Sequence, residues 1–156
     1  MSLSPDLIIN WQCKPFNQLL PLELYKIMQL RNAVFAVEQN CVYLDADDKD
    51  LSAFHLCGWH NDTLAAYSRL LPAGVDYAEI SVGRVVTNID YRKNGIGKIL
   101  LQKAIENCFL VFGRQNIKIG AQLYLKKFYE SFDFKQVSDT YLEDGIEHIK
   151  MLLVAK

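Results

Sequence analysis

The sequence has few cysteines, and none of them lies in a pattern that forms a structural site. Cys13, Cys41, Cys57 and Cys108 are far apart and form no C-x-x-C pair. A disulfide framework and a structural zinc site are therefore not expected, and we predict a protein without a metal ion. Free thiols of this kind fit a reducing compartment, which predicts a cytoplasmic location.

The sequence also lacks an excess of charge and a long hydrophobic run. Its 17 basic and 18 acidic residues give a formal net charge of -1, which does not support a general nucleic-acid or membrane surface. No stretch is long and apolar enough to cross a bilayer. The first residues, MSLSPDLIINW, lack the basic start and apolar run of a secretory signal. We therefore expect neither a nucleic-acid partner nor a membrane partner.

No repeat, low-complexity tract or linker divides the chain, so its 156 residues predict a single domain, 1–156. Residue patterns predict helices at 21–37, 98–112 and 123–132, and strands at 7–11, 54–59, 64–71, 79–87, 116–121, 134–142 and 146–154. The polar segment EQNCVYLDADDKD predicts a surface loop, and Asp144-Gly145 predicts a hairpin turn. Strands and helices mix without strict alternation, which indicates an α+β fold with one mixed sheet and helices packed on it.

The segment YRKNGIG, residues 91–97, joins a predicted strand to a predicted helix. The first backbone N–H groups of a helix have no helical partner, and they bind phosphate where the chain can approach closely. Gly95 and Gly97 leave room for such an approach, and three basic residues beside them add positive charge. The alternative is a tight turn with a solvated basic rim. A P-loop is absent, and Leu100 stands where a dinucleotide-binding fingerprint needs its third glycine.

The pattern R-x-x-G-x-G, formed by Arg92, Gly95 and Gly97, resembles the coenzyme A pyrophosphate loop of the GNAT superfamily of N-acetyltransferases. FYESFDF is similar to that family's F-Y-x-x-x-G-F pattern and places Tyr129 at its tyrosine, with Asp133 where glycine is usual. LRNAVFAVEQNCVYLDAD and YLEDGIEHIKM are similar to signatures of the ElaA-type subgroup. The likeness covers nearly the whole chain. It implies a single mixed, mostly antiparallel twisted sheet with helices on both faces.

The resemblance implies acetyl-CoA as the co-substrate and direct transfer of its acetyl group to a primary amine of a small molecule or peptide. The residues that it maps to the cofactor are Val85, Val86, Thr87, Arg92, Lys93, Asn94, Gly95, Ile96, Gly97, Lys98 and Gln122. A free backbone N–H on the strand near Val86 would polarise the thioester carbonyl. Two alternatives stay open, namely a regulatory module that holds coenzyme A without turnover and an enzyme that uses a bulkier acyl group.

Two catalytic residues are expected for this chemistry. Tyr129 is the expected proton donor to the departing thiolate, because a phenol of pKa ~10 and a thiol of pKa ~8.5 are close enough for useful transfer. The alternative is a tyrosine ring that only packs under the sheet. A lysine-like amine, with a pKa of ~10.4, is almost wholly protonated at neutral pH and needs a general base. Glu79 is the expected base, since strand alternation places it on the face of Val85 and Thr87; a solvated strand end is the alternative.

Glu38, Arg84 and His148 are expected to face the amine, and Glu38 or His148 could instead be the base, although a lone histidine is more often structural. Arg69 and Arg84 each interrupt an apolar strand, where an unpaired charge is costly. One of them is expected to pair with Glu38 and shape the acceptor site; the alternative is a pair of edge arginines that reach water. DADDKD, residues 45–50, lacks the glycine and distal glutamate of an EF-hand and is expected to be a solvated acidic loop. A homodimer could complete the acceptor pocket.

Overall fold

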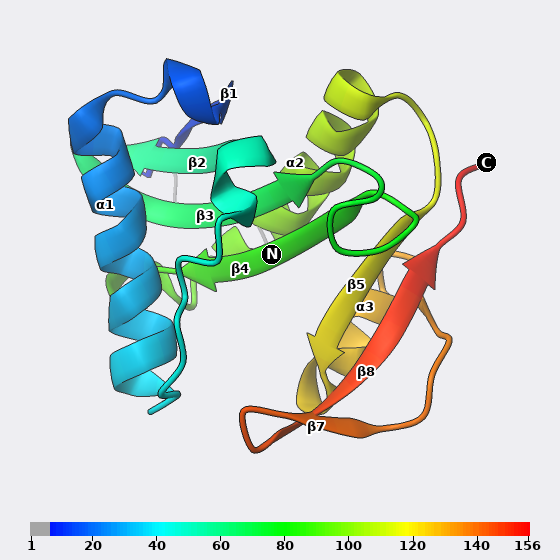
Figure 1. Cartoon of the computed structure of the whole chain (residues 1–156). Helices are drawn as coiled ribbons and strands as arrows, with labels where there is room; N and C mark the ends of the chain where they lie inside the picture. The colour runs from blue at the N-terminus through cyan, green and yellow to red at the C-terminus, as the bar shows by residue number, and fades with distance from the viewer. Residues whose placement is uncertain (1–6) are drawn as a thin grey trace.

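The computed structural model describes residues 7–156 (Figure 1). Residues 1–6, the first part of the segment expected not to be a secretory signal, lie outside the described residues. The strands are β1 (Asn10–Pro15), β2 (Phe54–His60), β3 (Thr63–Leu71), β4 (Ser81–Thr87), β5 (Ile117–Gln122), β6 (Lys135–Gln136), β7 (Tyr141–Glu143) and β8 (Ile146–Leu153). The α-helices are α1 (Pro21–Arg31), α2 (Ile96–Phe112) and α3 (Lys126–Glu130). No helix of this part of the chain has the length and apolarity needed to span a membrane.

The strands form two four-stranded antiparallel sheets that meet at one point. The first has the order β1-β2-β3-β4, and the second has the order β5-β8-β6 with β7 paired to β8. Ile80 and Ile117 form a parallel bridge between them, beside which the Lys118 N–H donates to the Ile80 carbonyl over 2.9 Å. From this bridge β4 and β5 diverge (Figure 1). The α+β class is confirmed, and the mixed sheet consists of these two antiparallel parts.

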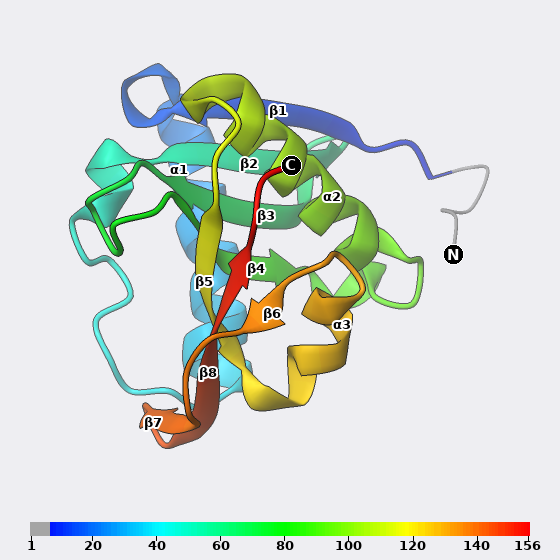
Figure 2. The same cartoon turned by 90° about the vertical axis from the view of Figure 1, so that its right-hand side faces the viewer.

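Helices cover both faces of the first sheet, as the family resemblance implies (Figure 2). On one face Ile27 and Leu30 of α1 pack in a cluster with Cys57 of β2. On the other face Leu100 of α2 packs in the main core with Leu56. Because successive side chains of a strand point to opposite faces, the neighbours Leu56 and Cys57 belong to different cores. The sheet is therefore held between two apolar layers.

β4 contains a bulge at the position where it leaves β5. Arg69 of β3 pairs with Gly83 and Tyr67 pairs with Val86, so Arg84 and Val85 together lie opposite the single residue Ser68. Arg84 has a φ of 48°, a left-handed conformation that side chains rarely adopt. The Ser68 hydroxyl donates to the Gly83 carbonyl over 3.1 Å and holds the distortion. Bulges of this kind re-aim side chains beside functional sites.

Several element boundaries differ from the prediction. The first strand lies at Asn10–Pro15 rather than 7–11, because its pairing with β2 extends to Pro15 opposite Phe54. The helix predicted at 21–37 continues past α1 as a π-helix, η2 (Asn32–Glu38). The strand predicted from residue 79 begins at Ser81.

The C-terminal third shows two further differences. The helix predicted at 123–132 consists of a 3₁₀ turn, η5 (Leu123–Leu125), followed by α3. The strand predicted at 134–142 is reduced to the short strands β6 and β7. The hairpin turn at Asp144-Gly145 is confirmed, and both residues have positive φ, 51° and 77°, as a type I′ turn requires.

Candidate active site

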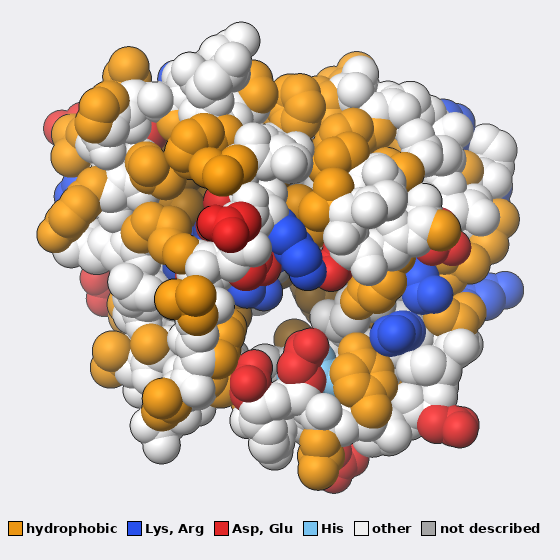
Figure 3. All heavy atoms as spheres, in the orientation of Figure 1, with side chains coloured by type: hydrophobic (Ala, Val, Ile, Leu, Met, Phe, Trp, Pro, Cys, Tyr) orange, Lys and Arg blue, Asp and Glu red, His pale blue; other side chains and the backbone are white. Residues whose placement is uncertain are grey.

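A cleft of about 490 Å³ opens where β4 and β5 diverge. Its walls come from η2, β4, β5, η5, α3 and the β7–β8 hairpin. In Figure 3 the molecule is hollowed between its two sheets, with acidic side chains along the rim. A second hollow of about 300 Å³ lies at the start of α2, and Thr87, Arg92, Gly97 and Phe128 line both spaces. The two hollows therefore form one continuous groove.

The two glycines of the YRKNGIG segment have different roles in this groove. Gly95 has a φ of 73° and precedes the first residue of α2, so it supplies a left-handed turn that other residues rarely adopt. A Cβ placed on Gly97 would meet no atom within 4 Å and would project into open space. Lys93 and Lys98 line the same hollow. The start of α2 thus offers free N–H groups, positive charge and room, which together fit a pyrophosphate.

Arg92 is held by a carboxylate on the far side of the groove. Its guanidinium donates to both carboxylate oxygens of Glu38, over 2.7 Å and 3.0 Å, and to the Thr87 carbonyl over 3.3 Å. Asn94, in contrast, turns inward and donates to the Tyr91 carbonyl over 3.1 Å. It lines neither hollow. Its contribution is therefore to close the turn.

Tyr129 lies on α3 at the wall of the cleft, with its ring edge-on between Phe128 and Phe134. The side chain is buried. Burial, with a smaller contribution from Tyr124, raises the pKa of Tyr129 to about 12. The phenol therefore stays protonated and able to donate a hydrogen bond throughout the physiological range.

His148 lies on β8 in register with Gln122 of β5, and both line the cleft. The Nδ1 atom is 2.8 Å from the Ile146 carbonyl, which can only accept, so Nδ1 carries the hydrogen. The Nε2 atom lies 3.4 Å from a carboxylate oxygen of Glu143. The ring also stacks on Tyr141, with centroids 5.9 Å apart. The only described histidine in the cleft is thus fixed in one tautomer with Nε2 toward Glu143.

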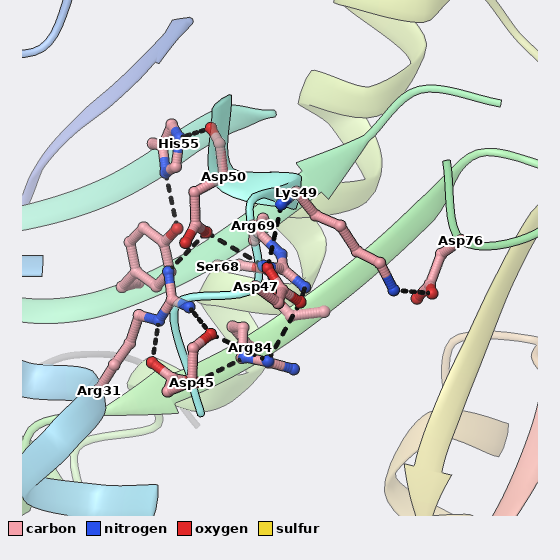
Figure 4. Close-up of polar contacts among 12 residues, drawn as sticks. Arg31, Asp45, Asp47, Lys49, Asp50, His55, Ser68, Arg69, Asp76 and Arg84 are labelled. Atoms are coloured by element: carbon pink, nitrogen blue, oxygen red, sulfur yellow. Dashed lines mark hydrogen bonds and ion pairs between the residues drawn. The ribbon is translucent and has the colours of Figure 1, made fainter. Parts of the chain in front are cut away.

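Beneath the rim, an arginine–aspartate cluster ties the segment 45–50 to the first sheet (Figure 4). Arg31 of α1 is fully buried and donates to Asp45 over 2.8 Å and to Asp50 over 2.7 Å. Burial alone would lower the pKa of Arg31, but Asp50 and Asp45 outweigh it and raise the pKa above its usual range. Arg31 was not singled out by sequence reasoning, because its position follows the apolar spacing of α1.

Two strand arginines complete this arginine–aspartate cluster. Arg69 donates to Asp47 over 2.7 Å and to Asp50 over 3.0 Å, and Arg84 donates to Asp45 over 2.7 Å. Burial would raise the pKa of Asp50, but Arg31 and Arg69 outweigh it and hold that pKa below its usual value. The same balance, with Arg69 and Arg84 as the cations, lowers the pKa of Asp47.

These contacts correct two expectations. Neither Arg69 nor Arg84 pairs with Glu38. Arg69 forms an ion pair with Asp47 and Arg84 with Asp45, whereas Glu38 pairs with Arg92. The segment DADDKD is not a solvated loop, since Asp45 and Asp50 are buried in ion pairs. Among residues 7–156 no group of three or more potential ligands is placed to hold a metal ion.

The structure brings most of the predicted site residues together. Apart from Asn94, every residue mapped to the cofactor lines the cleft or the adjoining hollow, as do Glu38, Arg84, Tyr129 and His148. Glu79 does not, because it lies in the bend before β4. Tyr43 and Glu143 also line the cleft although sequence reasoning did not single them out. The available signal was that both lie inside the two ElaA-type segments.

Comparison with known proteins places these features in a family. Residues 36–155 match the family model described as an acetyltransferase (GNAT) domain. Protein ElaA of Escherichia coli is 41% identical over 146 residues, covering 92% of this chain and 95% of that protein. Its crystal structure superposes with a TM-score of 0.87, covering 93% of this chain and 99% of the other at 40% identity. An acyl-CoA N-acyltransferase from Pseudomonas aeruginosa gives a TM-score of 0.89 at 35% identity, with the same coverage of both chains.

Proposed function

Because the chain belongs to the GNAT acetyltransferase family, we propose that it transfers the acetyl group of acetyl-CoA directly to a primary amine of a small molecule or peptide. Family membership and the likeness to an acyl-CoA N-acyltransferase support an acyltransferase that binds an acyl-CoA. The observation that carries the finer proposal is the continuous groove, which has a hollow lined by Arg92, Lys93 and Lys98 at one end and Tyr129 along its wall.

The proposed roles follow the groove from end to end. The first N–H groups of α2, with Gly95 and Gly97, hold the pyrophosphate. Residues 85–87 of β4 pair with the pantetheine arm, and a backbone N–H near Val86 polarises the thioester carbonyl. When bound, acetyl-CoA supplies an activated acetyl group. The amine enters from the β7–β8 side of the cleft, where His148 lies, and Arg84 of β4 lines the same cleft.

Tyr129 faces the leaving thiolate in this arrangement. A phenol with a pKa of about 12 is a much weaker acid than a thiol of pKa ~8.5, so complete proton transfer is unfavourable. Tyr129 therefore stabilises the thiolate mainly by donating a hydrogen bond. A hydrogen bond to a charged group contributes about 1.5–3 kcal/mol, which corresponds to roughly 10- to 100-fold in rate.

The first experiment measures acetyl-CoA binding through the melting temperature of the protein. A ligand at a hundredfold excess over its Kd adds ~2.7 kcal/mol to the free energy of unfolding. Gly97→Phe should abolish the acetyl-CoA shift while leaving the unliganded protein folded, because its side chain projects into the hollow. Gln102→Phe, on the exposed face of the same helix, should keep the shift.

The second experiment measures thiol release from acetyl-CoA over a panel of primary amines. Turnover on at least one amine supports the enzyme, whereas tight binding without turnover on any of them supports the regulatory module that holds coenzyme A. Faster thiol release from longer acyl-CoAs than from acetyl-CoA would show that the enzyme uses a bulkier acyl group. The cytoplasmic location, the single domain and a homodimer that completes the acceptor pocket stay predictions.

A further inference from the structure

We propose that His148 is the general base of this enzyme, with Glu143 stabilising the imidazolium that forms. This inference rests on the proposed amine acetylation and names the group that takes the proton from the amine. It starts from the hydrogen bond between His148 and the Ile146 carbonyl. Because a carbonyl cannot donate, the neutral ring must carry its hydrogen on Nδ1, and the lone pair is left on Nε2.

The Nε2 atom of His148 lies beside the Glu143 carboxylate. A neutral Nε2 and the Glu143 carboxylate, 3.4 Å apart, are both acceptors and cannot hydrogen-bond to each other. Once Nε2 takes a proton, the same two groups become an ion pair. The stack on Tyr141 and the bond to Ile146 keep the ring in this orientation. Protonation therefore needs no rearrangement of the histidine.

The other carboxylates are less suited to this step. Glu79 lies outside the cleft, and Glu38 already has both oxygens bonded to Arg92. Asp144 is exposed at the tip of the β7–β8 turn. The ionisable groups that share the cleft with His148 on the surrounding elements are Glu38, Cys41, Tyr43, Arg84, Arg92, Tyr124, Tyr129, Glu143 and Asp144, with Tyr141 stacked on its ring. Nε2 of His148 accepts no hydrogen bond from the described residues and lies 3.4 Å from the Glu143 carboxylate.

His148 acts in the proposed acetyl transfer as the acceptor of a proton from the amine. The amine nitrogen forms a bond to the thioester carbon, the C–S bond breaks, and the electron pair of that bond stays on sulfur. Because the amine arrives as an ammonium ion, two protons leave its nitrogen. The first passes to Nε2 of His148, directly or over one water, and frees the lone pair for attack. The second passes to solvent once the new C–N bond has formed. The thiolate accepts a hydrogen bond from Tyr129 and then a proton from solvent, and the imidazolium returns its proton to solvent.

The test compares two amines of equal length, butylamine and O-propylhydroxylamine, in single-turnover reactions with saturating acetyl-CoA. Butylamine is protonated at neutral pH and depends on a base, whereas the alkoxyamine is already neutral. His148→Gln should slow the single-turnover rate on butylamine by about 100-fold or more. Its effect on the rate with the alkoxyamine should be smaller by a factor of at least ten. His60→Gln, the same change at a histidine bonded to Tyr91 outside the cleft, should match the parent on both amines.

Glu143→Gln gives a second readout of the same step. Without the anion the imidazolium loses its ion-pair partner, so Glu143→Gln should slow transfer to butylamine more than transfer to the alkoxyamine while acetyl-CoA affinity stays unchanged. An equal loss on both amines in His148→Gln would mean that the histidine only positions the acceptor. A parent-like rate on butylamine would assign the base to another group.

The tautomer can be measured without any acceptor. Nitrogen-15 NMR of the imidazole should show the neutral ring of His148 protonated on Nδ1. A neutral ring protonated on Nε2 would overturn the proposal even if the enzyme acetylates amines. A parent protein that binds acetyl-CoA but acetylates neither probe would count against the proposed function, while the NMR result would still decide the tautomer of His148.

Discussion

At the scale of single residues, burial changes what Tyr129 can do. The pKa of about 12 keeps the phenol protonated but makes it a poor acid toward a thiolate. We expect Tyr129→Phe to bind acetyl-CoA as the parent does and to slow single-turnover transfer by roughly 10- to 100-fold, the effect of one hydrogen bond to a charged group. A loss of 1000-fold or more would show complete proton transfer. An unchanged rate would make Tyr129 a packing residue.

The ion pair between Arg92 and Glu38 also affects function at the scale of single residues, because a cofactor pyrophosphate would compete with the Glu38 carboxylate for the Arg92 guanidinium. Both side chains are partly exposed, and such a pair is worth ~0.2–1 kcal/mol. We therefore expect Glu38→Gln to tighten acetyl-CoA binding by up to about fivefold at low salt, as measured by calorimetry. Glu106→Gln, an exposed glutamate on α2, is the matched control. Weaker binding in Glu38→Gln would show that the glutamate orients Arg92 for the cofactor instead.

At the scale of elements, the segment 45–50 is fixed to α1, β3 and β4 by buried charge rather than by apolar packing. Asp50 accepts from both Arg31 and Arg69, so its loss leaves two buried cations short of an anion. We expect Asp50→Asn to lower the free energy of unfolding by about 3 kcal/mol, measured by urea denaturation. Asp48→Asn, at an exposed position of the same segment, should change it by less than about 0.5 kcal/mol. Equal effects of the two changes would contradict the importance of the buried pairs.

The elements also show what the sequence could and could not predict. Amphipathic spacing and turn residues identified α1, α2 and the Asp144-Gly145 turn because these signals are local. The bulge at Arg84 and the partners of Arg69 were not predictable, since they depend on strand register and on a loop distant in the chain. The groove was predictable as a set of residues through the family motifs. The position of Glu79 outside the cleft was not predictable, because β4 begins two residues later than the strand pattern indicated.

At the scale of the whole molecule, the two apolar layers on either side of the first sheet enclose ionisable groups that must stay neutral. Tyr67 is fully buried and donates to Nδ1 of His55 over 2.7 Å, while Nε2 of His55 donates to the Asp50 carbonyl over 2.9 Å. Burial is the main cause that raises the pKa of Tyr67 and lowers the pKa of His55. The cores therefore couple the stability of the fold to pH, even far from the groove.

Cys57 and Cys108, one on each side of the sheet, allow this coupling to be measured at high pH. Burial raises the pKa of each thiol to about 12, whereas a thiol of the unfolded chain ionises near ~8.5. Unfolding between these values releases protons, so the free energy of unfolding is retained below about pH 8.5 and falls as the pH rises toward 12. Each thiol contributes a slope of about 1.4 kcal/mol per pH unit. We expect the Cys57→Ala/Cys108→Ala protein to be less stable at neutral pH but to lose stability less steeply between about pH 9 and 11, in urea denaturation under reducing conditions. Parallel curves for the two proteins would mean that the thiols do not contribute to the alkaline loss.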